Sequence, residues 1–326
     1  MSIKKLLVVS GLILILGFNA RGQESPYEPR ISYSLSLDEV TWNAFQVAIT
    51  VSNPNQPRLV FVMPVWMPGA YVRMDFGKNV RNFKAQGTRG QSLEVIQLDD
   101  HRWSVAAGTN SVVRVSYQVE VSPRGFMGRS LDSTRARIDG PATFMYVQGL
   151  ENLPVTVRFN LPKNWKVATG LRSTSYLFEY TAKNYDTLID SPVEMGDFVD
   201  YYFNHQGRNF TITIDGDTSF NIENFLLMIN KIVSYQADLF NDLPFENYLF
   251  MFNVYPDYRG GGGLEHHNST TIGLSGKKLA EDVESAANVI AHEFFHLWNV
   301  KRIHPRLLGP AFPRTSFPPR YIYPTR

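Results

Sequence analysis

The 326-residue chain contains no cysteine. Neither a disulfide bond nor lipidation of a cysteine at a processing site is therefore possible, and a buried core must stabilise the fold. Hydrophobic residues make up 44% of the chain and aromatic residues 13%. This composition is sufficient for such a core and argues against wholesale disorder. The length suits two domains better than one.

The chain also lacks the excess of positive charge that is typical of nucleic-acid-binding proteins. Residues 1–22 and 301–326 contain Lys and Arg but no Asp or Glu, so the formal charge of +2 hides a net negative charge in residues 23–300. An acidic body gives no electrostatic reason to expect a nucleic acid as partner. The sequence shows neither an internal repeat nor a low-complexity linker.

A long apolar run is missing as well. The mainly apolar stretch at residues 6–18 is shorter than the roughly 20 residues that a membrane-spanning helix needs. Two lysines precede it, and the small residues Ala20 and Gly22 follow it, which is typical of a cleaved secretory signal peptide over residues 1–22. An uncleaved membrane anchor is the alternative. We therefore expect a periplasmic or secreted protein with no integral membrane segment after removal of the signal peptide.

The first half of the mature chain predicts a β-rich domain over residues 23–198. Apolar residues alternate with serines from Ile31 to Leu37, which is the period of a half-buried strand. Turn-rich segments rather than helical periods separate the strand-like pieces. Further strands are expected at residues 45–51, 58–65, 112–121, 143–147 and 155–161. Antiparallel strands in this arrangement predict a sandwich-like fold.

The pattern changes after about Phe198. Apolar residues at helical spacing predict helices over residues 222–240 and 281–303, and apolar runs predict strands over residues 245–255 and 269–274. The predicted fold class is therefore α+β. A second domain is expected over residues 199–310, and its helix over residues 281–303 carries the main chemical motif.

That motif is His-Glu-x-x-His within VIAHEFFHLWNVKRI, residues 289–303. On a helix, His292 and His296 are one turn apart, so both imidazoles can reach one metal ion. Glu293 lies about 100° around the helix, where it can take a proton from a metal-bound water without being a ligand. Zinc would lower the pKa of that water and polarise a scissile carbonyl group. The alternative is that the histidines are ordinary polar residues on a helix face.

Several segments together resemble the glycyl aminopeptidase family of zinc metallopeptidases. They are AHEFFHLWNVKRI, GGGLEHHNSTT, MPVWMPGAYVRMDFGKNVRNF (63–83) and YDTLIDSPVEMGDF (185–198). The resemblance implies a β-rich N-terminal domain, a thermolysin-like catalytic domain of the gluzincin type and often a PDZ domain. It also implies a peptide substrate, Zn²⁺ as cofactor, His292 and His296 as its ligands and Glu293 as the general base.

The same resemblance assigns substrate binding to Gly262, Gly263 and Glu265. These residues match a Gly-x-x-Glu segment on an edge strand, where the backbone pairs with the substrate and the glutamate binds its free α-ammonium group. Glycines let a peptide backbone approach closely, and a carboxylate forms a charge-assisted hydrogen bond with an amine. An ordinary glycine-rich turn is the alternative for this segment.

The third zinc ligand is the feature that the chain lacks. The resemblance implies a glutamate on the next helix, but no Asp or Glu follows Glu293. A metzincin pattern would need Gly at 299 and His at 302, where the chain has Asn299 and Arg302, and His304 fits neither pattern.

Residues 311–326 are rich in proline and arginine and contain no acidic residue. They are either an evolved tail or an out-of-frame sequence that begins near Pro310, and the abrupt change of composition favours the second explanation. We therefore expect a zinc aminopeptidase by descent, truncated, with weak or no activity in this form. A non-catalytic exported binding protein with a vestigial metal site and a zinc endopeptidase remain the alternatives, and the sequence leaves the oligomeric state open.

Overall fold

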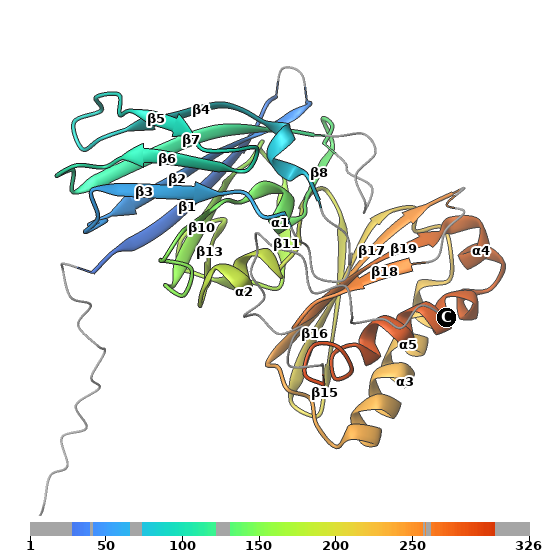
Figure 1. The fold of residues 1–326 in the computed structure, drawn as a ribbon. Coiled ribbons are helices and arrows are strands. Elements are labelled where there is room, and N and C mark those ends of the chain that lie inside the picture. The colour runs from blue at the N-terminus through green and yellow to red at the C-terminus, as the bar shows by residue number, and fades with distance from the viewer. Residues whose placement is uncertain are drawn as a thin grey trace, which may run out of the picture.

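The computed structural model describes residues 28–39, 42–65, 74–121, 131–256, 258 and 262–303. The expected signal peptide, His304, the tail and part of the 63–83 segment lie outside these residues. Among the described residues, none of the helices combines the length and the hydropathy that a membrane-spanning helix requires. The predicted α+β class is confirmed: a β-rich region leads into a region where helices cover a sheet (Figure 1).

Within the described residues, the N-terminal region contains three sheets, of which the seven-stranded and the four-stranded sheet pack face to face around a shared core. The core side chains alternate along the strands, as the serine-interrupted pattern of Ile31 to Leu37 predicts. The seven-stranded sheet has the order β12 (Arg172–Ser173), β13 (Glu179–Ala182), β10 (Val155–Asn160), β1 (Arg30–Leu37), β2 (Ala44–Ser52), β7 (Val112–Glu120) and β4 (Val80–Gln86). The four-stranded sheet has the order β5 (Val95–Gln97), β6 (Arg102–Ala106), β3 (Arg58–Val62) and β9 (Tyr146–Val147).

Two predicted strands of this region are wrong in extent. The strand expected over residues 58–65 ends at Val62, as β3. The expected strand over residues 143–147 reduces to the two residues of β9, because Gly140–Thr143 form the short helix α1 with a proline in its first turn. The Phe144 N–H then donates to the Gly140 carbonyl oxygen. The other short helices of this region are η1 (Phe76–Asn79) and α2 (Tyr185–Ile189).

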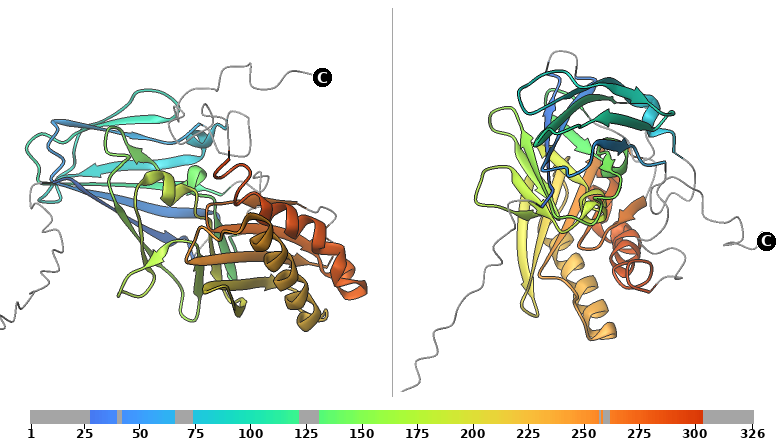
Figure 2. Two further views of the ribbon diagram at one scale, coloured as in Figure 1. Left: turned by 90° about the horizontal axis from the view of Figure 1, so that it is seen from below. Right: turned by 60° about the vertical axis from the view of Figure 1, so that its left-hand side comes forward.

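In the described part of the second region, one five-stranded sheet carries helices on one face (Figures 1 and 2). Its order is β15 (Val199–His205), β16 (Arg208–Gly216), β17 (Asn247–Tyr255), β19 (Ser269–Ser275) and β18 (Gly262–Glu265). The central strand β17 pairs in parallel with both neighbours and is buried on both faces, which explains its nearly continuous apolar sequence. The predicted helix over residues 222–240 is confirmed as α3 (Ile222–Phe240).

The predicted helix over residues 281–303 is wrong in extent. The chain forms α4 (Gly276–Glu281), the 3₁₀ turn η2 (Val283–Ala286) and α5 (Ala287–Phe295). Asp282 interrupts the helical period because its backbone is extended and its side chain accepts from the Glu284 N–H. After α5 the chain turns back, with the Lys301 N–H donating to the His296 carbonyl oxygen and Val300 at φ 102°.

The face of the five-stranded sheet opposite the helices packs on a three-stranded sheet of the N-terminal region. This sheet has the order β11 (Lys166–Thr169), β14 (Val193–Gly196) and β8 (Arg135–Ile138). Leu249 and Met251 of β17 meet Ala168 and Phe198 in an apolar contact. The two regions therefore share a packed interface.

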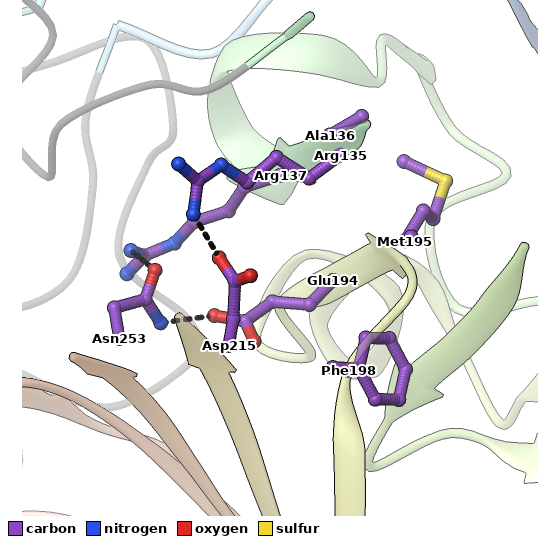
Figure 3. Close-up of a pocket in the computed structure, with 9 residues that line it drawn as sticks. Arg135, Ala136, Arg137, Glu194, Met195, Phe198, Asp215 and Asn253 are labelled. Carbon is purple, nitrogen blue, oxygen red and sulfur yellow. Dashed lines mark hydrogen bonds and ion pairs between the residues drawn. The ribbon is translucent and has the colours of Figure 1, made fainter. Parts of the chain in front are cut away.

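A polar cluster lies at the same interface (Figure 3). Arg135 forms an ion pair of 2.9 Å with Asp215, and Arg137 donates to the Asn253 Oδ1 atom over 3.2 Å. Asn253 in turn donates to Glu194, which is buried. Burial raises the pKa of Glu194, against the opposing effect of the Arg137 guanidinium. These contacts join β8 and β14 to β16 and β17 on the side of the sheet that faces away from α5.

Candidate active site

The two histidines of α5 converge on one point. Their Nε2 atoms lie 3.0 Å apart, with the ring planes at 83°. Two nitrogen ligands of a tetrahedral zinc ion, each at about 2.0–2.1 Å, would lie roughly 3.3 Å apart. The spacing of His292 and His296 therefore suits a shared zinc ion, as the one-turn separation in the sequence predicts.

His296 is held in the tautomer that a metal ligand needs. Its Nδ1 atom lies 2.9 Å from the Asn299 carbonyl oxygen. Because a carbonyl oxygen only accepts, Nδ1 carries the proton and the Nε2 lone pair is available. The backward turn after α5, which shortened the helix relative to the prediction, is what brings this carbonyl to the ring.

Helix α5 holds these residues rigidly through its opposite face. Ile290, Phe294 and Leu297 are fully buried, as their helical spacing predicts. The Phe294 ring packs edge-on against Tyr248 of β17 at 5.0 Å between centroids. From α3, the Gln236 side chain donates to the Ala291 carbonyl oxygen over 2.8 Å. The helix therefore has apolar and polar anchors within one turn of His292.

Glu293 lies between α5 and the edge strand β18. Glu293 is 5% exposed, and its Oε2 atom has no hydrogen-bond partner among the described residues. Burial and the nearby Glu265 carboxylate raise the pKa of Glu293 to about 7, although His296 and the Gly263 N–H act in the opposite direction. A carboxyl group that titrates near neutral pH and has an unpaired oxygen is suited to proton transfer.

Gly263 of β18 makes this close approach possible. A Cβ atom on Gly263 would lie 2.4 Å from the Glu293 Cγ atom, far inside van der Waals contact. A Cβ atom on Gly262 would meet nothing within 4 Å. The two neighbouring glycines are therefore different: Gly263 leaves room for Glu293, whereas Gly262 is open towards solvent.

Glu265 completes the group from the same strand. Carboxylate oxygens of Glu265 and Glu293 and a ring nitrogen of His296 all lie within 4.8 Å of one another. Two carboxylates at this distance create a strongly negative site that attracts a cation, whether a metal ion or an ammonium group. The structure thus brings together His292, His296, Glu293, Gly263 and Glu265, five of the six residues that the sequence predicts.

Gly262, the sixth predicted residue, lies at the start of β18, and the strand as a whole forms the border of the site. Within the described residues, β18 pairs with β19 alone, in antiparallel register with Gly263 opposite Ile272. Among the residues that the structure describes, no strand covers the outer backbone edge of β18, to which an extended peptide could add as a further strand.

A charged group beside the site is not predicted by the sequence. Asp190, immediately after α2, accepts from the Lys301 ammonium over 2.7 Å and from the His267 N–H and ring Nδ1 over 2.9 Å each. Burial by itself opposes ionisation of Asp190, but Lys301, His266 and His267 outweigh it and hold the pKa of Asp190 well below its ordinary value. Asp190 and Lys301 are 111 residues apart, and no local pattern in the sequence joins them.

Two family profiles match the chain. The one described as Peptidase M61 N-terminal domain covers residues 32–197, about half of the chain, and the one described as M61 glycyl aminopeptidase covers residues 285–315. The second match includes the whole His-Glu-x-x-His motif. No curated protein sequence matches the chain.

Among solved structures, the chain is similar to an aminopeptidase N family protein from Idiomarina loihiensis. The two share 29% sequence identity with a TM-score of 0.79, and the match covers 88% of this chain and 51% of that one. The chain thus spans about half the length of this relative. An M1 zinc metallopeptidase from Deinococcus radiodurans aligns at 13% identity and a TM-score of 0.46 over 82% of this chain and 63% of its own, a similarity too low to support an inference.

Proposed function

Because the chain belongs to the M61 glycyl aminopeptidase family, we propose that it acts as a zinc-dependent aminopeptidase, which hydrolyses the peptide bond next to a free N-terminus. The proposal rests on one observation. A pair of convergent imidazoles and a buried carboxylate on α5 face the open edge strand that carries Glu265. The activity and the peptide substrate are proposals for the whole protein, since the chain spans about half the length of its structural relative.

The residues present fit zinc as the cofactor. His292 and His296 would hold the ion through their Nε2 atoms, whose separation of 3.0 Å and neutral imidazole chemistry suit it. When bound, zinc would polarise the scissile carbonyl group and activate a water molecule. A catalytic zinc normally takes three protein ligands, and the described residues provide two assigned ligands. We therefore expect low turnover from the 326-residue chain.

Glu293 acts as general base and then as general acid. Its carboxylate takes a proton from the attacking water and later delivers it to the amine that leaves. Its pKa of about 7 allows both steps near neutral pH. The N–H of Gly263 donates to this carboxylate, and the Oε2 atom has no hydrogen-bond partner among the described residues.

Strand β18 binds the substrate. The peptide pairs along the outer edge of β18 through backbone hydrogen bonds, and Gly262 and Gly263 allow its close approach. Glu265 accepts hydrogen bonds from the α-ammonium group of the first residue. Because Glu265 lies within 4.8 Å of Glu293 and His296, an amine bound there would place the first peptide bond beside α5. This register would explain the removal of single N-terminal residues.

A pair of substrates tests the proposal. Zinc-loaded protein should hydrolyse alanyl-4-nitroanilide slowly but leave N-acetyl-alanyl-4-nitroanilide intact, and Glu293→Gln should abolish the zinc-dependent rate. Equal cleavage of both substrates would instead indicate an endopeptidase. Zinc binding without any rate above that of Glu293→Gln would indicate a binding protein with a vestigial site.

We also propose that the protein is exported to the periplasm or secreted, on the basis of the signal-like residues 1–22. Mass spectrometry of the mature protein from the extracytoplasmic fraction should show an N-terminus at Gln23. An intact N-terminus in the cytoplasmic fraction would contradict export.

A further inference from the structure

Asp190 belongs to the N-terminal region but contacts the segments that follow α5 and β18, the two elements that form the site. It follows α2 and its side chain is 17% exposed. One carboxylate oxygen, Oδ1, accepts from Lys301 at 2.7 Å and lies 3.6 Å from the His266 Nδ1 atom. The other, Oδ2, accepts from the backbone N–H and the ring of His267, each at 2.9 Å. Oδ1 therefore lies between the segment that follows α5 and the turn that follows β18, whereas Oδ2 is directed at the turn alone.

The Lys301 contact holds the end of α5. The Lys301 N–H donates to the carbonyl oxygen of His296 over 3.1 Å, and its side chain is 8% exposed. A buried ammonium group needs a counter-charge, and the Asp190 carboxylate supplies it at 2.7 Å. The ion pair thus fixes the turn whose Asn299 carbonyl oxygen orients the His296 ring.

The His267 contact holds the end of β18. Residues 266–269 form the tight turn between β18 and β19, closed by the His266 N–H donating to the Ser269 carbonyl oxygen. Asp190 accepts the His267 N–H of this turn, and Asn268 donates to the Gly170 carbonyl oxygen over 2.8 Å. The turn begins directly after Glu265, so its attachment to the N-terminal region determines where Glu265 lies.

We propose that Asp190 is a positioning residue of the site. Its two oxygens connect α5 and β18, and so set the distance between Glu265 and the His292–Glu293–His296 group. The inference rests on the proposed function for the roles of those residues. The N-terminal β-rich region then contributes to the site by aligning its metal-binding and substrate-binding halves.

A second ion pair across the same interface provides a matched control. Arg135 and Asp215 also join the two regions, over 2.9 Å, but connect β8 to β16 on the face of the sheet opposite α5. The Asp215 side chain is 16% exposed, close to the 17% of Asp190. Asp215→Asn therefore removes a similar interdomain charge without touching α5 or β18.

The experiment measures hydrogen exchange by mass spectrometry together with zinc binding by calorimetry on the full chain. Asp190→Asn should speed exchange at least tenfold in residues 264–269 and 296–303 and weaken zinc binding about tenfold. Asp215→Asn should leave exchange in these segments and zinc affinity unchanged. A merely structural role would lower the melting temperature of both variants without a difference in zinc affinity. Weaker zinc binding in Asp190→Asn alone therefore identifies a positioning role.

Lys301→Met removes the contact of Asp190 with Lys301 but keeps its contact with His267. It also keeps the inference testable if Asp190→Asn does not fold. It should speed exchange in residues 296–303 alone, because Asp190 still accepts from the His267 N–H. Unchanged exchange in both segments, or equal changes in Asp190→Asn and Asp215→Asn, would overturn the inference. If the unsubstituted chain bound no zinc, the proposed function would fail, whereas the exchange comparison would still decide the role of Asp190.

Discussion

Helix α5 and strand β18 supply the two halves of the candidate site, and they are held in different ways. Helix α5 is anchored by its own fully buried Ile290 and Phe294, and Leu297, just beyond its end, is fully buried as well. Strand β18 has no fully buried residue, and within the described residues it pairs with one strand only. A helix with apolar anchors keeps metal ligands in place, whereas a half-exposed edge strand depends on its turn and its neighbours. The metal-binding half is therefore rigid, whereas the position of the substrate-binding half depends on contacts with the N-terminal region.

The largest expected effect concerns the rigid half. Glu293→Gln should lower kcat of the zinc-loaded protein about 10²–10⁴-fold, because it removes the general base without changing the shape of the side chain. Zinc affinity, measured by calorimetry, should stay within a factor of about three, since Glu293 is assigned no ligand role. A variant that keeps its activity would show that another group transfers the proton.

The next effect concerns the attachment of both halves and depends on pH. Asp190→Asn should lower the free energy of unfolding by about 3 kcal/mol at pH 7, because it leaves Lys301 buried without its counter-charge. The pKa of Asp190 is held below its ordinary value, so its stabilising contribution is complete above the ordinary Asp pKa of about 4 and is lost as the pH falls through the lower pKa of the folded state.

Urea unfolding of the two proteins between pH 7 and pH 2.5 measures this difference. The gap between them should be constant above about pH 5 and should shrink below about pH 4. A gap that is the same at every pH would show that the charge of Asp190 has no part in it.

Two glycine substitutions on β18 compare Gly263, which contacts Glu293 of α5, with Gly262, which has no neighbour on that side among the described residues. Gly263→Ala should lower kcat about 100-fold, because its Cβ atom would displace the Glu293 side chain, and misplacements of about 1 Å have effects of this size. Gly262→Ala should leave kcat unchanged and raise KM, since its Cβ atom meets nothing within the described part of the protein but lies where the peptide backbone approaches β18. Steady-state kinetics on one substrate measures both variants, and equal losses would contradict the assigned contact.

The smallest expected effect concerns the substrate-binding half alone. Glu265→Gln should lower kcat/KM for alanyl-4-nitroanilide by about tenfold or more, which corresponds to a lost hydrogen bond between charged groups. The loss should appear mainly in KM. An unchanged KM for the free-amine substrate would remove Glu265 from the amine site.

The sequence predicts an element well when the residues that determine its ends lie within or next to that element. Helix α3 is predicted residue for residue, because the Asn221 side chain caps its first turn and the left-handed Asn241 ends it where the apolar period ends. The helix over residues 281–303 is predicted too long, because the Asp282 side chain bonds to the backbone and outweighs the apolar period. Short strands such as β8, β11 and β14 were missed, since four residues rarely show a period.

The same distinction applies to the site. His292, Glu293 and His296 lie within five positions on one helix, so spacing alone predicts their convergence. The contact between Gly263 and Glu293 and the ion pair between Asp190 and Lys301 join distant segments. Only the pairing of β18 with β19 and the packing of the two regions bring these segments together, and one sequence carries no record of such pairings.

Zinc titration by calorimetry, with His296→Ala and His101→Ala compared with the unsubstituted chain, decides whether α5 carries a metal centre. His101 lies with Asp99 and Asp100 in a second group of potential ligands, in the N-terminal region. One zinc ion should bind per chain, and this binding should be lost in His296→Ala and retained in His101→Ala. Zinc binding that survives His296→Ala, or that disappears in His101→Ala, would contradict a metal centre on α5.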